Sequence, residues 1–139
     1  MKPGITLDLF KPPIIYVDDN PFNLMVTKDI VEKHCRDAEG FSSPFEALER
    51  ILERHGDKEP VKYVLTDIEM PGMDGYEFAW KLMKLMEEKK IEKLKIIGFS
   101  AHESKCEKQK CLKSGMYDYL SKPLSNEKFK EFILNENDQ

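Results

Sequence analysis

The chain has 139 residues, 35% of them charged, and its 22 Lys and Arg residues against 26 Asp and Glu residues give a net charge of -4. This length allows one domain with a full core. The charge balance excludes the basic stripe of a nucleic-acid-binding protein, and no apolar run approaches the ~18 residues of a transmembrane helix. With no signal-peptide core near the start and no framework spacing of its three cysteines, the chain is expected to be cytoplasmic.

Short apolar runs alternate with helical patterns from residue 14 onward. Before them, residues 1–13 are expected to form a flexible leader that ends at Pro12-Pro13. The predicted strands are short and rich in Ile, Val, Leu or aromatic residues, which is typical of buried parallel strands. They cover residues 14–17, 38–41, 63–66, 95–99 and 117–120.

Helices are predicted between these strands, at residues 21–34, 44–56, 76–89, 104–114 and 126–135. Asn20 and Ser125 are the expected N-caps of the first and last helices. Ser43-Pro44-Phe45-Glu46 is a capping box with proline at the first helical position. The fourth helix differs from the others because few of its residues are apolar, so it is expected to be held weakly, either as an ordinary solvated helix or as a face that can shift.

Five strands that alternate with five helices predict an α/β fold, with a doubly wound parallel sheet covered by helices on both faces. The crossovers between strands should be right-handed. We assign residues 14–135 to this domain and residues 136–139 to a tail.

Polar residues follow four of the predicted strands. Asp18 and Asp19 come after the first strand, Asp67 after the third, Ser100 after the fourth, and Lys122 after the fifth. In open α/β sheets, ligands bind beyond the carboxyl ends of the strands. Three carboxylates, one hydroxyl and one ammonium are therefore expected to meet at one edge of the sheet.

Three neighbouring carboxylates repel one another, since two unit charges ~4 Å apart cost about 4 kcal/mol at an effective dielectric constant of 20. Either one of them takes up a proton or a cation binds. Oxygen ligands open to water suit Mg²⁺ or Mn²⁺. A hard cation, an anion-binding Lys122 and an accessible carboxylate together favour phosphoryl transfer onto that carboxylate.

Two other interpretations of the acidic residues fail on pattern. An EF-hand starting at Asp67 needs a bidentate Glu at its twelfth position, where Phe78 stands. A phosphatase of the haloacid dehalogenase type needs Asp-x-Asp after its first strand, and Asp18-Asp19-Asn20 does not match. A scaffold that binds partners without phosphorylation stays open as an alternative.

Four motifs in order give the chain its resemblance to a known family: residues 17–20, 66–75, 99–101 and 115–123. Together they resemble the receiver domain of two-component response regulators, over about residues 14–134, and most of all the receivers of hybrid histidine kinases. The resemblance implies a flavodoxin-like (βα)5 fold with strand order 2-1-3-4-5. It also implies a signalling protein that catalyses only its own aspartyl phosphorylation and dephosphorylation.

Residue by residue, the resemblance makes Asp67 the phosphoacceptor. Asp18, Asp19 and Asp67, with the backbone carbonyl of Glu69, would bind Mg²⁺. Lys122 would pair with the phosphoryl group, and its peptide bond to Pro123 is expected to be cis.

The resemblance also implies a switch and a set of tuning positions. Ser100 would turn toward the phosphoryl group and Tyr119 would rotate inward with it, although Tyr119 also suits an ordinary core position. Glu69 and His102 occupy positions that tune dephosphorylation, or are ordinary surface residues. Phosphorylation is expected to bias the face made by the fourth helix, the fifth strand and the fifth helix.

The partner implied by the resemblance is a histidine kinase or a histidine phosphotransfer protein. It is expected to dock at the exposed start of the first helix, near Asn20 and Pro21. No contact with nucleic acid or membrane is expected for this segment. The chain is interpreted as either a free single-domain regulator or a piece of a hybrid kinase.

Overall fold

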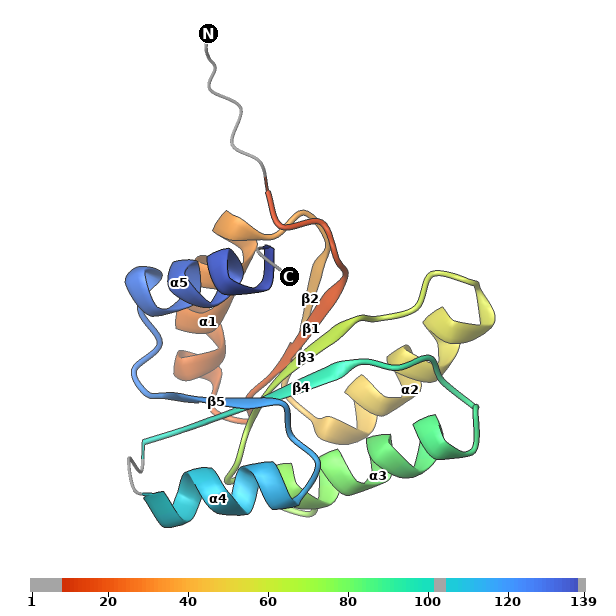
Figure 1. Cartoon of the computed structure of the whole chain (residues 1–139). Coiled ribbons are helices and arrows are strands. Elements are labelled where there is room, and N and C mark those ends of the chain that lie inside the picture. Colours follow the sequence, from red (N-terminus) through yellow and green to blue (C-terminus); the bar gives the residue numbers. More distant parts are fainter. Residues whose placement is uncertain (1–8, 102–104, 138–139) are drawn as a thin grey trace, which may run out of the picture.

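Strands and helices alternate along the chain (Figure 1). The computed structural model describes residues 9–101 and 105–137, and its strands are β1 (Ile14–Val17), β2 (Ala38–Phe41), β3 (Tyr63–Asp67), β4 (Lys95–Ser100) and β5 (Asp118–Ser121). The helices are α1 (Pro21–His34), α2 (Pro44–Gly56), α3 (Gly75–Glu87), α4 (Lys105–Lys113) and α5 (Asn126–Asn137). Each predicted element is present, with ends that differ by two residues or fewer.

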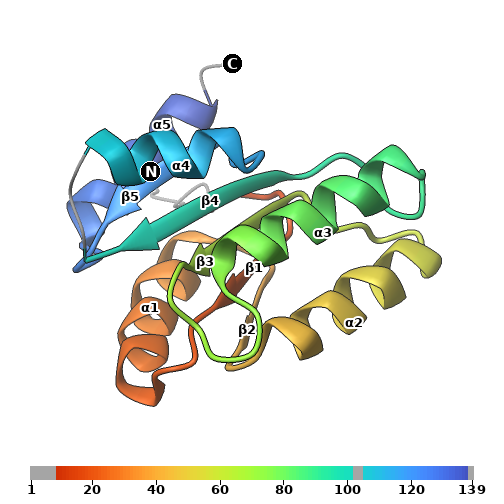
Figure 2. The same ribbon diagram turned by 90° about the horizontal axis from the view of Figure 1, so that it is seen from below.

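The sheet has the predicted topology. Its strands are parallel and follow the order β2-β1-β3-β4-β5 (Figure 2). In register, Val17 lies beside Thr66, and Ser100 lies beside Ser121. The carboxyl ends of the strands therefore reach the same edge of the sheet, and the polar residues singled out in the sequence lie at this edge.

Apolar clusters fill both sides of the sheet. One joins strand residues to α1 and α5, and the other joins them to α2 and α3, with Cys111 of α4. Helices α1 and α5 lie on one side of the sheet, and α2 and α3 lie on the other (Figure 1). Side chains that alternate along a strand enter opposite clusters, as Ile14 and Ile15 do. Strands β1 and β3 are buried along their whole length, because helices cover both of their faces.

The predicted caps begin the helices. The Asn20 side chain accepts a hydrogen bond from the Asn23 N–H at 3.0 Å, and Ser125 Oγ accepts one from the Lys128 N–H at 3.1 Å. Ser43 Oγ accepts from the Phe45 N–H at 3.1 Å, so this residue caps α2 at the second helical position. A capping box would join Ser43 to the third helical position instead.

Helix α4 is attached to the domain by few buried residues. Among those of its side chains that the structure describes, Cys111 is buried and Leu112 is 46% exposed. A hydrogen bond from the Tyr76 hydroxyl to Glu107 also joins α3 to α4. The predicted scarcity of apolar burial in this helix is confirmed for these residues.

Part of the predicted leader contacts the domain. Phe10 is buried, its N–H donates to the His34 carbonyl at 2.9 Å, and its carbonyl accepts from the Arg36 N–H at 2.9 Å. Residues 1–8 lie outside the described residues, and the domain boundaries stay a prediction. At the other end, α5 continues to Asn137 and so includes the first two residues assigned to the tail. Within the described part of the chain, no helix has the length and apolar character to cross a membrane.

Candidate phosphoacceptor site

Two turns at the carboxyl edge of the sheet position the acidic residues. After β1, the Asp18 N–H donates to the Phe41 carbonyl at 3.1 Å, and the Asn20 N–H donates to Asp18 Oδ1 at 3.0 Å. After β3, the Ile68 N–H donates to Asp67 Oδ1 at 2.9 Å, and the Gly75 N–H closes the loop onto the Ile68 carbonyl at 2.7 Å. Hydrogen bonds donated by backbone N–H groups thus fix both turns.

Gly75 lets the loop after β3 fold closely onto the strand end. A Cβ at this position would lie 2.6 Å from the Asp67 carbonyl oxygen and 2.9 Å from the Ile68 Cα. Neither backbone atom can move aside cheaply, so a residue without a side chain is required. The same loop carries the Asp74 side chain, which caps α3 by accepting from the Glu77 N–H at 2.9 Å.

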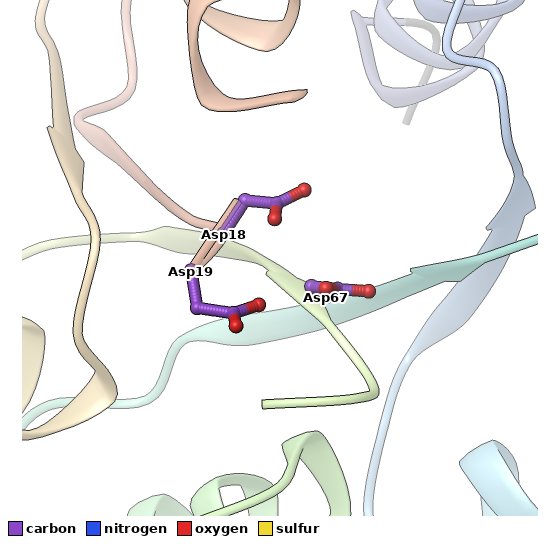
Figure 3. A group of neighbouring side chains, drawn as sticks. All are labelled: Asp18, Asp19 and Asp67. Carbon is purple, nitrogen blue, oxygen red and sulfur yellow. The ribbon is translucent and has the colours of Figure 1, made fainter. Parts of the chain in front are cut away.

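The three aspartates predicted to cluster do so. Asp18, Asp19 and Asp67 each offer a carboxylate oxygen, and these oxygens all lie within 4.8 Å of one another (Figure 3). Asp18 and Asp67 are buried, whereas Asp19 is more open to solvent. Asp18 Oδ2 is buried and has no hydrogen-bond partner among the described residues. A buried carboxylate oxygen in this state needs a positive partner.

Lys122 is the cation that faces this cluster. Its Nζ lies 3.0 Å from Asp67 Oδ1 and 3.4 Å from Asp18 Oδ2, and its side chain is 18% exposed. The ammonium also lies 4.9 Å from the centroid of the Phe99 ring. Among the described residues, one ammonium faces three carboxylates, which leaves an excess of negative charge at the cluster.

Burial and charge shift the pKa values of this pair. Burial raises the pKa of Asp67 above its ordinary value, and the negative charge of Asp18 adds to the rise, although the hydrogen bond from Lys122 opposes it. Burial alone would lower the pKa of Lys122, but the hydrogen bond to Asp67 and the charges of both carboxylates raise it. The charged form of Lys122 is therefore stabilised, while ionisation of Asp67 costs more than that of an ordinary aspartate.

A small polar cavity of about 230 Å³ opens beside Asp67, and Ser100, Glu69 and Lys122 also line it. The structure thus brings most of the predicted site residues to one place. Two further residues of its lining are Asn23 and Ala101; Ala101 belongs to the motif at residues 99–101, but neither residue was assigned a role at the site from the sequence.

The remaining predicted residues differ in position. Tyr119 is half-buried and packs against the cluster under α2 and α3, beside Gly98 in the neighbouring strand. The Glu69 side chain is exposed. His102 lies outside the described residues. The peptide bond between Lys122 and Pro123 is cis, as the resemblance implied.

The donor set suits a hard divalent cation. Carboxylate oxygens are the ligands that Mg²⁺ and Mn²⁺ prefer, and one of the clustered carboxylates, that of Asp18, has a buried oxygen without a hydrogen-bond partner among the described residues. A divalent cation would balance the excess negative charge that Lys122 leaves. The residues present therefore fit a magnesium-type site.

Comparison with known proteins gives the family. The family model described as the response regulator receiver domain matches residues 14–134. The sensor histidine kinase GacS of Pseudomonas protegens is 32% identical over 133 residues, which cover 96% of this chain and 14% of that protein. The kinase BarA of Escherichia coli is 31% identical over 121 residues, covering 87% of this chain and 12% of that protein.

Solved structures agree with the family match. The receiver domain of the histidine kinase CKI1 from Arabidopsis thaliana, complexed with Mg²⁺, has a TM-score of 0.77 and 26% identity. This match covers 93% of the present chain and 95% of the CKI1 chain. The fold and the acidic edge define a receiver-type signalling domain.

The chain belongs to the response regulator receiver domain family, which serves two-component and phosphorelay signalling. It spans about one-seventh of the length of the GacS relative.

Proposed function

We propose that Asp67 accepts a phosphoryl group from a phosphohistidine of a partner protein. The observation that carries this proposal is the contact of 3.0 Å between Asp67 and Lys122, set among three clustered carboxylates. This arrangement offers a nucleophile and a fixed cation at the same point. Both hydrogen bonds that Asp67 accepts from the described residues reach Oδ1, so Oδ2 is the proposed nucleophile.

The transfer forms a bond from Asp67 Oδ2 to phosphorus and breaks the phosphorus–nitrogen bond of the donor. The electron pair of the broken bond stays on the imidazole nitrogen, and Asp67 becomes an acyl phosphate. Lys122 lies where it can bind a phosphoryl oxygen, because its ammonium already contacts the nucleophilic carboxylate. Hydrolysis by water later restores the carboxylate, and Glu69 and His102 are proposed to tune that step.

Asp18, Asp19 and Asp67, with the Glu69 backbone carbonyl, are the proposed ligands of Mg²⁺ or Mn²⁺. When bound, this ion would neutralise developing negative charge on the phosphoryl oxygens. The proposed activity is confined to the domain's own phosphorylation and dephosphorylation.

Ser100 and Tyr119 are the proposed switch residues. Ser100 is buried on the cavity beside Asp67, and Tyr119 lies on the neighbouring strand. The acyl phosphate carries about two negative charges next to Ser100, where the carboxylate of Asp67 carried one. Because α4 buries few side chains, we propose that the face of α4, β5 and α5 responds to that charge.

The proposed partner is a histidine kinase or a histidine phosphotransfer protein. Three large apolar side chains are exposed near the starts of α1 and α2: Phe22 is 70% exposed, Met25 60% and Phe45 51%. Both helices follow the carboxyl ends of β1 and β2, at the edge of the sheet that carries Asp67, so these side chains lie where a helix bearing a phosphohistidine would dock. The related kinases are consistent with such a partner.

Intact mass after incubation with Mg²⁺ and acetyl phosphate tests the proposal. The expected result is a gain of one phosphoryl group that is lost with EDTA and in Asp67→Asn. Labelling of Asp67→Asn at the wild-type rate would refute the assignment of the phosphoacceptor. If the folded chain takes no label from acetyl phosphate or from a phosphohistidine protein, the alternative of a phosphorylation-independent scaffold is favoured.

A further inference from the structure

A second surface, separate from the acidic site, has the features of a docking groove. Two hollows of about 820 and 390 Å³ adjoin each other, because Met83, Glu87 and Gly115 line both of them; the two together are called the groove. It is bounded by α3, by the turn after α4 and by the first residues of β3 and β4. The amino ends of these strands lie opposite the edge that carries Asp67.

The floor of the groove is apolar and partly open to solvent. Trp80 is 58% exposed and Met83 is 40% exposed, while Leu94 and Ile96 are buried beneath the larger hollow. Gly115 is required under Met83, because a Cβ there would lie 2.6 Å from Met83 Cγ and because its φ is +101°. Large apolar side chains left exposed side by side mark interaction sites more often than isolated ones do.

The lining of the groove is basic, although the chain carries a net charge of -4. Among the described residues, its lysines are Lys62, Lys84, Lys93, Lys95 and Lys113, and Glu87 is its one acid. Lys95 pairs with Glu136 at 2.9 Å and Lys62 pairs with the exposed Glu92 at 3.0 Å. The other three lysines make no ion pair with any residue that the structure describes.

The geometry of α3 indicates the shape of the occupant. Trp80, Met83 and Glu87 line the groove at spacings of three and four residues, so they follow one face of the helix over about 10 Å. A second helix that lies along this face would pack its own apolar residues against Trp80 and Met83 and into the larger hollow. Acidic residues flanking that apolar stripe would meet Lys84, Lys93 and Lys113.

We propose that this groove binds an acidic amphipathic helix of a partner protein. The binding does not depend on the chemistry of Asp67, because no residue of the acidic cluster lines the groove. Trp80 is the only tryptophan of the chain, and Lys84 Nζ lies 5.5 Å from its ring. Its fluorescence therefore reports directly on this surface.

The test uses two synthetic helical peptides without tryptophan that share one leucine stripe. In one peptide, all positions outside the leucine stripe are glutamate; in the second peptide, the same positions are lysine. Titration into the full chain should shift the Trp80 emission to shorter wavelength with the acidic peptide, at an affinity at least about tenfold higher than that of the basic peptide. Added salt should weaken the complex.

Charge-reversal variants locate the binding. Combined replacement of Lys84, Lys93 and Lys113 by glutamate should lower the affinity for the acidic peptide at least about tenfold. The matched control reverses Lys28, Lys33 and Lys130, which are exposed on α1 and α5, and should bind like the wild type. Circular dichroism checks that both variants are folded.

Four outcomes would overturn the proposal: no binding of the acidic peptide, equal binding of both peptides, equal weakening in both triple variants, or self-association of the chain that Met83→Asp abolishes. The last outcome would make the groove a contact between copies of this chain. Asp67→Asn should bind the acidic peptide as the wild type does, which separates this test from that of the phosphoacceptor.

Discussion

Replacement of Lys122 by methionine tests whether its ammonium holds the acidic site together. Methionine keeps most of the length of the side chain but removes the charge that lies 3.0 Å from Asp67 and 3.4 Å from Asp18. The two carboxylates stay buried, with side-chain exposures of 8% and 1%. Without a metal ion, we therefore expect the variant to be less stable than the wild type.

Two bounds give the size of this loss. Removing one partner of a buried ion pair typically costs about 3 to 5 kcal/mol. The protein can instead protonate one aspartate, which at pH 7 costs about 4 kcal/mol relative to an ordinary aspartate pKa near 3.9. Because the cheaper route prevails, the expected loss is about 3 to 4 kcal/mol, or roughly 10 °C in melting temperature for a domain of this size.

Urea unfolding in EDTA and in millimolar Mg²⁺ measures the effect. In EDTA, the free energy of unfolding of Lys122→Met should be lower than that of the wild type. Mg²⁺ should restore most of this loss, because the proposed ion supplies the missing positive charge to the same carboxylates. Lys130→Met, which removes an exposed lysine of α5, is the control and should change stability by less than about 0.5 kcal/mol. Equal stability of Lys122→Met and wild type in EDTA would refute this account of the site.

Three further predictions concern neighbouring parts of the fold. Gly75→Ala should lower the free energy of unfolding by about 1 to 3 kcal/mol, since its Cβ would overlap the Asp67 carbonyl; an unchanged urea midpoint would contradict this. Burial would raise the pKa of Glu136, but hydrogen bonds from two tyrosines and a lysine outweigh burial and lower the pKa. The ionised Glu136 therefore stabilises the fold above pH ~4.5, and this stabilisation is lost as the pH falls through the pKa of Glu136 in the folded protein. The melting-temperature difference between wild type and Glu136→Gln should therefore shrink in acid. A constant difference from pH 7 to 3 would contradict this role of the ionised Glu136. Tyr76→Phe removes the bond to Glu107, so hydrogen exchange should speed up in α4 more than in α3.

The sequence predicted the acidic site well because the site follows from the strands. A buried parallel strand is a short apolar run, and its carboxyl end is the next polar residue along the chain. Asp18, Asp67, Ser100 and Lys122 could therefore be placed at one edge before any geometry was known. Gly75 belongs to the motif at residues 66–75, but its steric role could not be predicted, because only the loop geometry shows that a Cβ would meet backbone atoms there.

Contacts between distant polar residues could not be predicted in the same way. Glu136 was assigned to a tail, yet its side chain accepts hydrogen bonds from Tyr63 at 2.7 Å and from Tyr117 at 2.8 Å and pairs with Lys95. A single acid near the end of the chain has no periodicity, so nothing in the pattern marks it as buried. Arg54 is a similar case: it is buried and bonded to acidic side chains near the edge strand β2.

The unequal attachment of the parts of this domain follows from where its apolar residues lie. The acidic cluster stands on strands buried on both faces, so a change of charge at Asp67 cannot be absorbed by moving β1 or β3. Helix α4 is tied down, among its described side chains, chiefly by Cys111 and by the bond from Tyr76 to Glu107. When the charge at the site changes, β1 and β3 therefore cannot move, whereas α4 is held by few contacts. For this reason we expect phosphorylation to act on α4 rather than on the sheet.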